Sequence, residues 1–251
     1  MIIVSKKADQ RLIEYLKSLD EVELFGPLKN VGSGISCHPD VLCCRLGGSA
    51  EAAAFKGNEA LLGEKYPADC RYNAVVLRRF IIHKQGITDP ALLAAAMYGL
   101  KSNEYSASSD SDIQQNRTAI RKFINVPQGY TKCNIAVVDD EHIITSDEGI
   151  AKALAAEADS DCVDSGKTVS DKLNCLLISP KQIELPGFRY GFIGGCSGRV
   201  GNKIIFNGNL KAHSDFRRIS AFIESCGLEL VYFEDFPLTD IGSIISQSSI
   251  L

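Results

Sequence analysis

The first 26 residues carry a pattern of apolar and polar positions that predicts a strand, a helix and a second strand. Residues 1–4 form one apolar run and residues 22–25 form another. Between them, apolar side chains recur at helical spacing, at Leu12, Tyr15, Leu16 and Leu19. Asp9 stands where a helix N-cap is expected. The same order of patterns returns later in the chain, in the segments 203–206, 214–226 and 228–233.

Further segments repeat one another. Residues 27–33 and 237–243 share Pro, Leu, Gly and Ser at the same places. Residues 74–82 align with residues 136–144; each segment indicates a hairpin of apolar strands around a polar turn, and each is followed by an Ala- and Leu-rich helical pattern. Residues 195–206 have the same layout. The chain therefore repeats a unit made of strands and a helix.

Five such units can be placed along the chain, and each is preceded by a proline. These prolines are Pro27, Pro67, Pro127, Pro186 and Pro237. The unit that starts near residue 237 would be completed by residues 1–26, so that strands from both ends of the chain close the set. Repeats stack because none buries its own faces, and a closed ring leaves no end unit exposed. We therefore predict one α/β domain, residues 1–251, built as a five-unit propeller with pseudo-fivefold symmetry. The alternative is an open sheet in which two βαβ segments are similar by chance.

Composition and charge narrow the class of protein. The 251 residues include 27 Lys and Arg against 31 Asp and Glu, giving a net charge of −4, which argues against nucleic acid as a partner. No apolar run reaches the length of a membrane span; the best is residues 91–100. Nine cysteines without a CxxC framework indicate reduced thiols in a cytoplasmic protein. Residues 102–115, rich in Ser, Asp and Asn, indicate an inserted loop.

The five predicted units resemble the pentein fold of the guanidine-modifying enzymes, which are arginine and agmatine deiminases, dimethylarginine hydrolases and amidinotransferases. The stretches 191–209 and 233–245 also resemble an uncharacterised bacterial family assigned to that fold. The enzymes carry a His-x-Asp motif on one unit, a nucleophilic Cys two units later, and carboxylates on other units. Here His38 and Asp40 form a His-x-Asp, Cys133 lies two units on, and Asp240 lies two units further. The order agrees with the enzymes if this chain is a circular permutant.

The resemblance implies a cysteine-dependent hydrolase, in preference to a transferase, that acts on a guanidino or amidino small molecule. A guanidinium is planar and cationic, and Asp40 and Asp240 could hold its N–H groups in pairs. Its carbon is a poor electrophile, which calls for a thiolate such as that of Cys133, with Lys132 or a bound cation lowering the thiol pKa. His38 could protonate the departing nitrogen and later take a proton from water.

The match to the enzyme motifs is incomplete. Pro39 replaces the usual aliphatic residue of His-x-Asp. The approach to Cys133, residues 129–133, has one glycine where the enzymes have Gly-Gly-Ser-x-x-Cys. Their Gly-Gly-Asp turn is replaced by residues 194–196 in one unit and residues 240–242 in another. Fold similarity does not by itself carry function across these differences.

Each assignment also has a structural alternative. Cys133 opens an apolar strand and would serve as a core residue, while His38, Asp40 and Asp240 stand at turns where they can bond to backbone. Cys196, flanked by small residues, is the alternative nucleophile.

Two asparagines, Asn30 and Asn207, occupy corresponding positions in their units and are further candidates for substrate binding. Cys37, His38, Cys43 and Cys44 lack a second cluster at ligand spacing, so no metal is expected, and no cofactor motif is present.

The competing class of function is a catalytically silent protein on the same fold that binds a small molecule or has a structural role. The enzyme requires Cys133, His38 and a carboxylate to converge on one substrate position, whereas the silent protein does not. The expected partner is a small-molecule substrate for the enzyme or a small-molecule ligand for the binding protein. Both classes are compatible with a homo-oligomer, and the sequence does not determine the oligomeric state.

Overall fold

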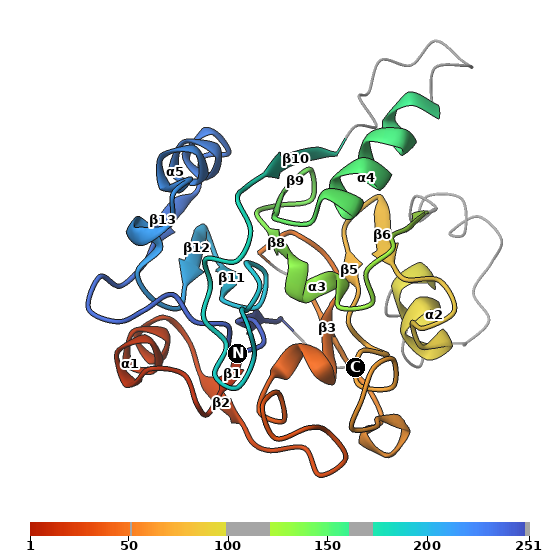
Figure 1. Ribbon diagram of the computed structural model, residues 1–251, viewed down its shortest axis with the longest axis horizontal. Helices are drawn as coiled ribbons and strands as arrows, with labels where there is room; N and C mark the ends of the chain where they lie inside the picture. Colours follow the sequence, from red (N-terminus) through yellow and green to blue (C-terminus); the bar gives the residue numbers. More distant parts are fainter. Residues whose placement is uncertain (51, 99–120, 161–172, 249–251) are drawn as a thin grey trace, which may run out of the picture.

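The computed structural model describes residues 1–50, 52–98, 121–160 and 173–248 (Figure 1). The expected insertion at 102–115 lies outside these residues. The helices are α1 (Gln10–Leu19), α2 (Pro90–Tyr98), α3 (Thr131–Asn134), α4 (Glu148–Ser160) and α5 (Phe216–Ser225). The strands are β1 (Ile2–Ser5), β2 (Val22–Phe25), β3 (Cys43–Arg45), β4 (Ala54–Lys56), β5 (Val75–Val76), β6 (Phe80–His83), β7 (Lys122–Asn125), β8 (Ile135–Val137), β9 (His142–Thr145), β10 (Asn174–Leu177), β11 (Ser197–Val200), β12 (Lys203–Phe206), β13 (Glu229–Val231) and β14 (Ile245–Ser246).

These strands form five small sheets. Four of them have three strands each, in the orders β14-β1-β2, β5-β6-β7, β8-β9-β10 and β11-β12-β13, and the fifth is the pair β3-β4. In each three-stranded sheet the first two strands are antiparallel and the third is parallel to the second. The expected hairpins within 74–82, 136–144 and 195–206 are therefore confirmed.

The expected five-unit propeller is wrong. The strands that the structure describes are divided among separate small sheets, four mixed sheets of three strands and one antiparallel pair, and no closed barrel or propeller is formed from them. The strands are only two to four residues long, and each pairs as a ladder only with neighbours in its own sheet. Bonds between sheets are scattered: an isolated bridge joins Leu46 to Val76, the Arg45 side chain donates to the carbonyl of Ser246, and the Ser246 hydroxyl donates to the carbonyl of Arg199. The sequence repeat thus predicts the local unit, but side-chain packing between units decides how they assemble.

The helix near the N-terminus forms as the pattern predicts. Asp9 is its N-cap, and the carboxylate accepts a hydrogen bond from the backbone N–H of Arg11. Leu12 and Leu16 are buried on one face. They join a cluster of apolar side chains that also contains Ile2 of β1 and Ile241, so this cluster packs segments from both ends of the sequence together.

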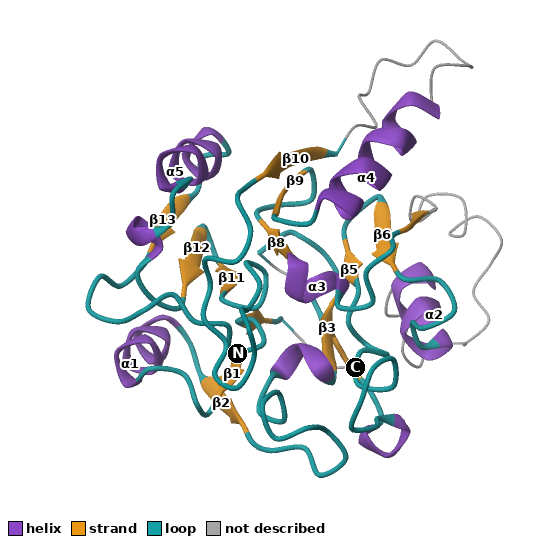
Figure 2. Ribbon diagram, in the orientation of Figure 1, coloured by secondary structure: helices purple, strands orange, loops and turns teal. Residues whose placement is uncertain are grey.

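The helices α1, α2, α4 and α5 lie at the outside of the molecule, while β3, β5, β8 and β11 lie nearer its middle (Figure 2). Strand β11 is in contact with β8 and β14, and β3 is in contact with β14 and β5. The loops that lead into these strands therefore come close to one another. Within the described segments, no helix combines the length and the apolar character needed to span a membrane.

Candidate functional site

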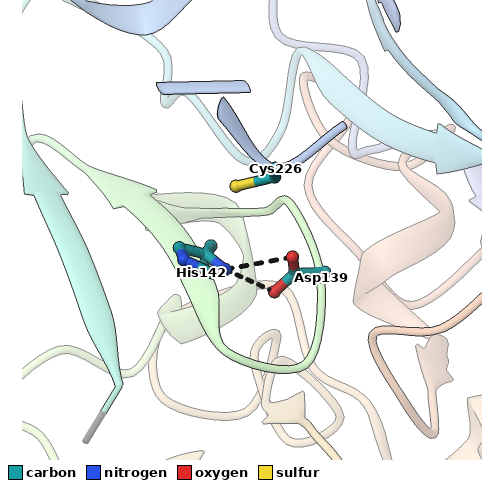
Figure 3. Close-up of side chains that lie close together, drawn as sticks. All are labelled: Asp139, His142 and Cys226. Atoms are coloured by element: carbon teal, nitrogen blue, oxygen red, sulfur yellow. Dashed lines mark hydrogen bonds and ion pairs between the residues drawn. The ribbon is translucent and has the colours of Figure 1, made fainter. Parts of the chain in front are cut away.

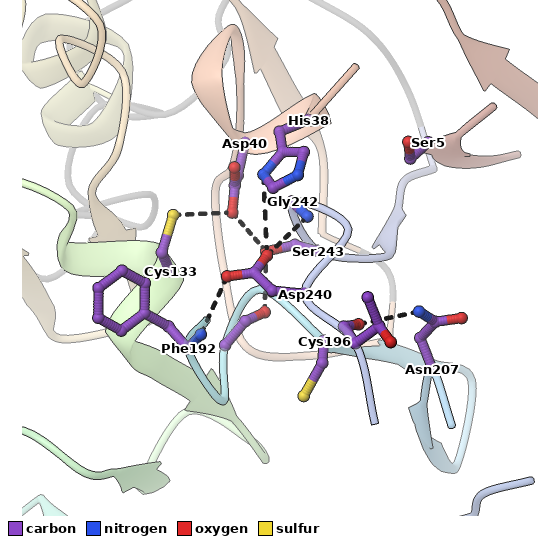
Figure 4. A network of polar contacts seen from close by, with 12 residues as sticks. Ser5, His38, Asp40, Cys133, Phe192, Cys196, Asn207, Asp240, Gly242 and Ser243 are labelled. Atoms are coloured by element: carbon purple, nitrogen blue, oxygen red, sulfur yellow. Dashed lines mark hydrogen bonds and ion pairs between the residues drawn. The ribbon is translucent and has the colours of Figure 1, made fainter. Parts of the chain in front are cut away.

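Four side chains singled out in the sequence meet where the loops before β3, β8 and β14 converge (Figure 4). His38 and Asp40 belong to the turn that contains the short 3-10 helix Pro39–Val41, Cys133 belongs to α3, and Asp240 precedes β14. Their exposed fractions are 5% for His38, 0% for Asp40, 6% for Cys133 and 3% for Asp240. The site is thus an enclosed polar group, and its energetics depend on how each polar atom is paired.

The thiol of Cys133 is held between a carboxylate and an amide. Its Sγ lies 3.3 Å from Oδ2 of Asp40, to which the S–H donates, and it accepts from Nδ2 of Asn73 at 3.1 Å. The Oδ1 of Asn73 accepts two backbone N–H groups, from Lys132 at 2.7 Å and from Cys133 at 3.1 Å. Asn73 therefore fixes the first turn of α3 and, with it, the position of the sulfur.

Ser243 connects Asp40 to a buried lysine. Its hydroxyl lies 2.8 Å from Oδ2 of Asp40 and 2.9 Å from the carbonyl of Gly194, and it accepts from Nζ of Lys132 at 3.0 Å. The backbone of Ser243 has a φ of 73°, in the left-handed region that is costly for a residue with a side chain. Strain of this kind persists where the surroundings hold the residue in place, and it is frequent at functional sites.

His38 and Asp240 form the second pair. Nδ1 of His38 lies 3.7 Å from Oδ1 of Asp240, and the carboxylate accepts backbone N–H groups from Phe192 and Gly242, each at 3.0 Å. Gly242 has a φ of 75°, and a Cβ at this position would collide with the Cα and Cβ of His38. Gly242 therefore allows the two loops to approach closely enough for the pair to form.

Burial sets the protonation of these groups. It raises the pKa of the Cys133 thiol well above its ordinary value, with the charges of Asp40 and Asp240 adding to the effect. The pKa of Asp240 rises to about 7, first through burial and then through the charge of Asp40. Burial lowers the pKa of both His38 and Lys132, and the charge of Asp40 partly offsets this. The expected lowering of the Cys133 pKa by Lys132 is thus overturned: the resting sulfur is a thiol that donates to Asp40.

One atom of this group is left without a partner. Oδ1 of Asp40 is buried and has no hydrogen bond to any described residue, although Oδ2 is close to both Cys133 and Ser243. A buried carboxylate oxygen without a donor carries a desolvation cost that a ligand N–H group would relieve. The unpaired Oδ1 belongs to the same carboxylate that contacts the Cys133 thiol, so a cationic ligand bound to it would lie next to the sulfur.

The other sequence candidates do not join this group. Cys196 is fully buried, and its thiol donates to the carbonyl of Ile193 at 3.3 Å; its sulfur points away from the site (Figure 4). Asn30 is exposed in a turn. Asn207 is buried, and its Nδ2 donates to the carbonyl of Thr239 at 2.8 Å, so it supports the loop that carries Asp240.

Gly194 and Gly195, which precede Cys196, do not serve to open a path to its thiol, as the sequence suggested. A Cβ on Gly195 would collide with the carboxylate of Asp240, and a Cβ on Gly194 would collide with the carbonyl of Lys132. The glycines therefore make room for the enclosed polar group, not for a ligand that approaches Cys196.

Two residues of the site were missed by sequence reasoning, Asn73 and Ser243. Asn73 directly precedes the apolar segment 74–82, much as Cys133 and Asn134 precede the aligned segment 136–144, and this shared position is the signal that could have found it. Ser243 lies in the repeated segment 237–243, but its role as a link between Asp40 and Lys132 requires a positive φ, which the sequence pattern does not predict.

The comparisons with known proteins give a family without an assigned activity. A family model described as "Family of unknown function (DUF6873)" matches residues 3–106 and 106–245. No curated protein and no solved structure matches the chain. These matches contain no link to the pentein enzymes, so that resemblance stays a prediction. Because the family model covers nearly the whole sequence, the chain belongs to the DUF6873 family.

Proposed function

We propose that this protein is a cysteine-dependent hydrolase of a small guanidino or amidino compound, with Cys133 as its nucleophile. The observation that carries the proposal is the contact between Cys133 Sγ and Asp40 Oδ2, 3.3 Å long between residues 93 positions apart, beside the unpaired Oδ1 of Asp40. A nucleophile next to a carboxylate with a free acceptor suits a substrate that is both cationic and rich in N–H donors.

The charges of the site support a cationic substrate. Asp40 and Asp240 face Lys132, whose ammonium is hydrogen-bonded to Ser243 and to backbone carbonyls. A guanidinium that enters would donate N–H groups to Asp40 Oδ1 and to the remaining lone pairs of Asp240. Its positive charge would also offset the negative charges of Asp40 and Asp240, which disfavour the Cys133 thiolate. The nucleophilic thiolate would therefore form when the substrate is bound.

The reaction then follows from the groups present. The thiol proton passes to His38, which is neutral because burial lowers its pKa. The Cys133 thiolate forms a C–S bond with the central carbon of the substrate, and the C–N bond to the departing nitrogen breaks as His38 gives it the proton. Water, deprotonated by His38, then attacks the same carbon, the C–S bond breaks, and the proton returns to the sulfur. The products are a carbonyl compound and ammonia or an amine.

A catalytically silent binding protein is the second candidate, and burial is the observation that favours it. Cys133 is 6% exposed and its pKa is raised, as in a thiol that only fills and bonds within a core. In that case the polar group stabilises the junction of three loops. Both candidates fit the free state of the eight described cysteines, which supports our expectation of a reducing, cytoplasmic compartment.

A pair of alkylating probes separates the two candidates. Haloacetamidine is cationic and shaped like a guanidinium, whereas haloacetamide is its neutral counterpart. For the enzyme we expect haloacetamidine to modify Cys133 selectively in the native protein, faster than haloacetamide does, and guanidino compounds to suppress the reaction. Peptide mass spectrometry identifies the modified residue. Asp40→Asn should remove the preference for the cationic probe, and Cys196→Ala should leave it unchanged.

The opposite pattern would support the silent protein. If both probes react slowly and first at the half-buried thiols of Cys175 and Cys226, the site does not admit a cation. Cys133→Ala completes the design: it should keep the fold, shown by its circular dichroism spectrum, while it loses selective labelling and any hydrolysis. A variant that unfolds would instead favour a core role for Cys133.

A further inference from the structure

A second cluster of chemically reactive side chains lies outside the contacts of the candidate site. It contains Asp139 from the turn between β8 and β9, His142 at the start of β9, and Cys226 directly after α5 (Figure 3). Nδ1 of His142 lies 2.9 and 3.0 Å from the two carboxylate oxygens of Asp139. One ligand atom from each residue lies within 4.8 Å of the others. A carboxylate oxygen, an imidazole nitrogen and a sulfur thus face a common point.

We propose that Asp139, His142 and Cys226 bind a Zn²⁺ ion, with three protein ligands and a fourth position for water. Sulfur, imidazole nitrogen and carboxylate oxygen are the ligands that zinc takes in proteins, at bond lengths of about 2.0–2.3 Å. Around a tetrahedral ion such ligand atoms are about 3.3–3.6 Å apart. The observed spread of up to 4.8 Å therefore closes to a coordination sphere by small side-chain rotations.

The surroundings of His142 suit a metal-bound imidazole. Its other ring nitrogen, Nε2, lies 3.3 Å from the side-chain amide of Asn174. When Nδ1 binds a metal, Nε2 carries the proton, and the Asn174 amide offers its oxygen to that proton after a half-turn. The ring of Phe222 packs edge-on against the imidazole at 5.6 Å between centroids, which holds the ring plane. Such outer groups orient a metal ligand and fix its tautomer.

The local charges balance a divalent cation. The thiol of Cys226 now donates to the carbonyl of Phe222 at 3.2 Å; on binding it would release its proton and become a thiolate. That thiolate and the carboxylate of Asp139 together neutralise Zn²⁺, while His142 stays neutral. Burial, and after it the negative charge of Asp139, raises the pKa of the Cys226 thiol, and a bound Zn²⁺ would supply the positive charge that favours the thiolate. The side chains of His142 and Asp139 are 27% and 25% exposed, so an ion can reach them from solvent.

The proposed ion would join two parts of the fold. Asp139 and His142 lie in the β8–β9 hairpin of the sheet β8-β9-β10, and Cys226 lies between α5 and β13 of the sheet β11-β12-β13. The sequence indicates no metal because the third ligand is distant along the chain and has no motif spacing to the other two. Binding to the folded state alone would also raise the stability of the protein.

The test uses the full-length protein freed of metal with a chelator, and Co²⁺ as a spectroscopic probe for zinc. We expect one Co²⁺ per chain, a near-ultraviolet band from the thiolate–cobalt bond, and the intense visible bands of tetrahedral cobalt. Zn²⁺ should displace the cobalt and abolish these bands. Cys226→Ser should remove the thiolate band and weaken zinc binding at least about 100-fold, more than loss of an outer group costs. Cys175→Ser, another half-buried thiol, should keep both.

Three results would overturn the proposal. One is a folded wild-type protein that binds neither Co²⁺ nor Zn²⁺ at a ratio of one per chain. Another is a thiolate band that survives in Cys226→Ser, which would assign the metal to a different cysteine. The last is unchanged zinc affinity in Asp139→Asn, a variant of nearly the same shape that provides a second test if Cys226→Ser does not fold. Cys133→Ala should keep the metal bands, so the result is independent of the proposed hydrolase.

Discussion

The close approach of the loop at Gly242 to His38 can be tested by adding a single methyl group. Gly242 has a φ of 75°, and the Cβ of an alanine would collide with both Cα and Cβ of His38. Gly201 offers a matched control, because its φ is 58° and a Cβ there would meet nothing within 4 Å. Gly242→Ala and Gly201→Ala therefore share the backbone penalty and differ in the steric one.

The two penalties can be separated in magnitude. The left-handed backbone costs a residue with a side chain about 1–2 kcal/mol, and both variants should lose this much stability. Overpacking against fixed backbone costs a further 1–3 kcal/mol or so, and only Gly242→Ala should lose it. For a chain of this size 1 kcal/mol corresponds to about 2–4 °C in Tm. Gly242→Ala should therefore melt roughly 2–12 °C below Gly201→Ala.

Urea unfolding followed by circular dichroism measures the difference directly. Equal m-values in the wild type and both variants would show that the free energies of unfolding can be compared. If Gly242→Ala and Gly201→Ala lose the same stability, the loops are not held together at His38, and the reasoning about this junction is refuted.

Two further substitutions test the polar contacts of the site. Asn73→Ala leaves the backbone N–H groups of Lys132 and Cys133 without an acceptor, so urea unfolding should show a loss of about 2–6 kcal/mol. The control is Asn58, an exposed side chain that caps the short 3-10 helix Glu59–Leu61; Asn58→Ala should lose only about 1 kcal/mol. Burial raises the pKa of Asp240 from 3.8 to about 7, so the folded protein keeps a proton there that the unfolded chain has released, and this contribution to stability falls as the pH rises from about 4 to 7. Unfolding measured across that range should show a smaller fall in stability for Asp240→Asn than for the wild type. If Asn73→Ala loses less than about 1 kcal/mol, Asn73 is not the acceptor that holds the first turn of α3. If the stability of Asp240→Asn depends on pH as that of the wild type does, the pKa of Asp240 is not raised by burial.

The local elements of the fold could be predicted from the sequence because their signals are local. The helical spacing of Leu12 and Leu16, with Asp9 before them, is enough to predict α1 and its cap. The repeated apolar segments predict the hairpins β5-β6 and β8-β9 for the same reason. The assembly of the sheets is different, since it depends on packing between residues that no period connects. The predicted closed propeller was wrong at this level.

In the candidate site, too, some residues could be predicted from the sequence and others could not. His38, Asp40, Cys133 and Asp240 were found because they follow the order of the motifs in the guanidine-modifying enzymes that the sequence resembles. The roles of Asn73 and Ser243 depend on hydrogen bonds to residues that are far away in the sequence; Asp40 and Ser243, for example, are 203 positions apart. The sign of the Cys133 pKa shift could not be predicted either. It depends on burial, and a neighbouring lysine in the sequence does not determine where its ammonium points.

The pairing of β1 with β14 gives the order of synthesis a physical importance. Ile2 and Ile3 are synthesised before their partners, Ser246 and Ile245, with almost the whole of the intervening chain made in between. Until then β1 keeps one edge without hydrogen bonds, and such an edge can pair with the strand of another chain. Contacts between distant positions also form slowly. A chaperone that shields this edge would therefore matter throughout the interval between the synthesis of β1 and that of β14.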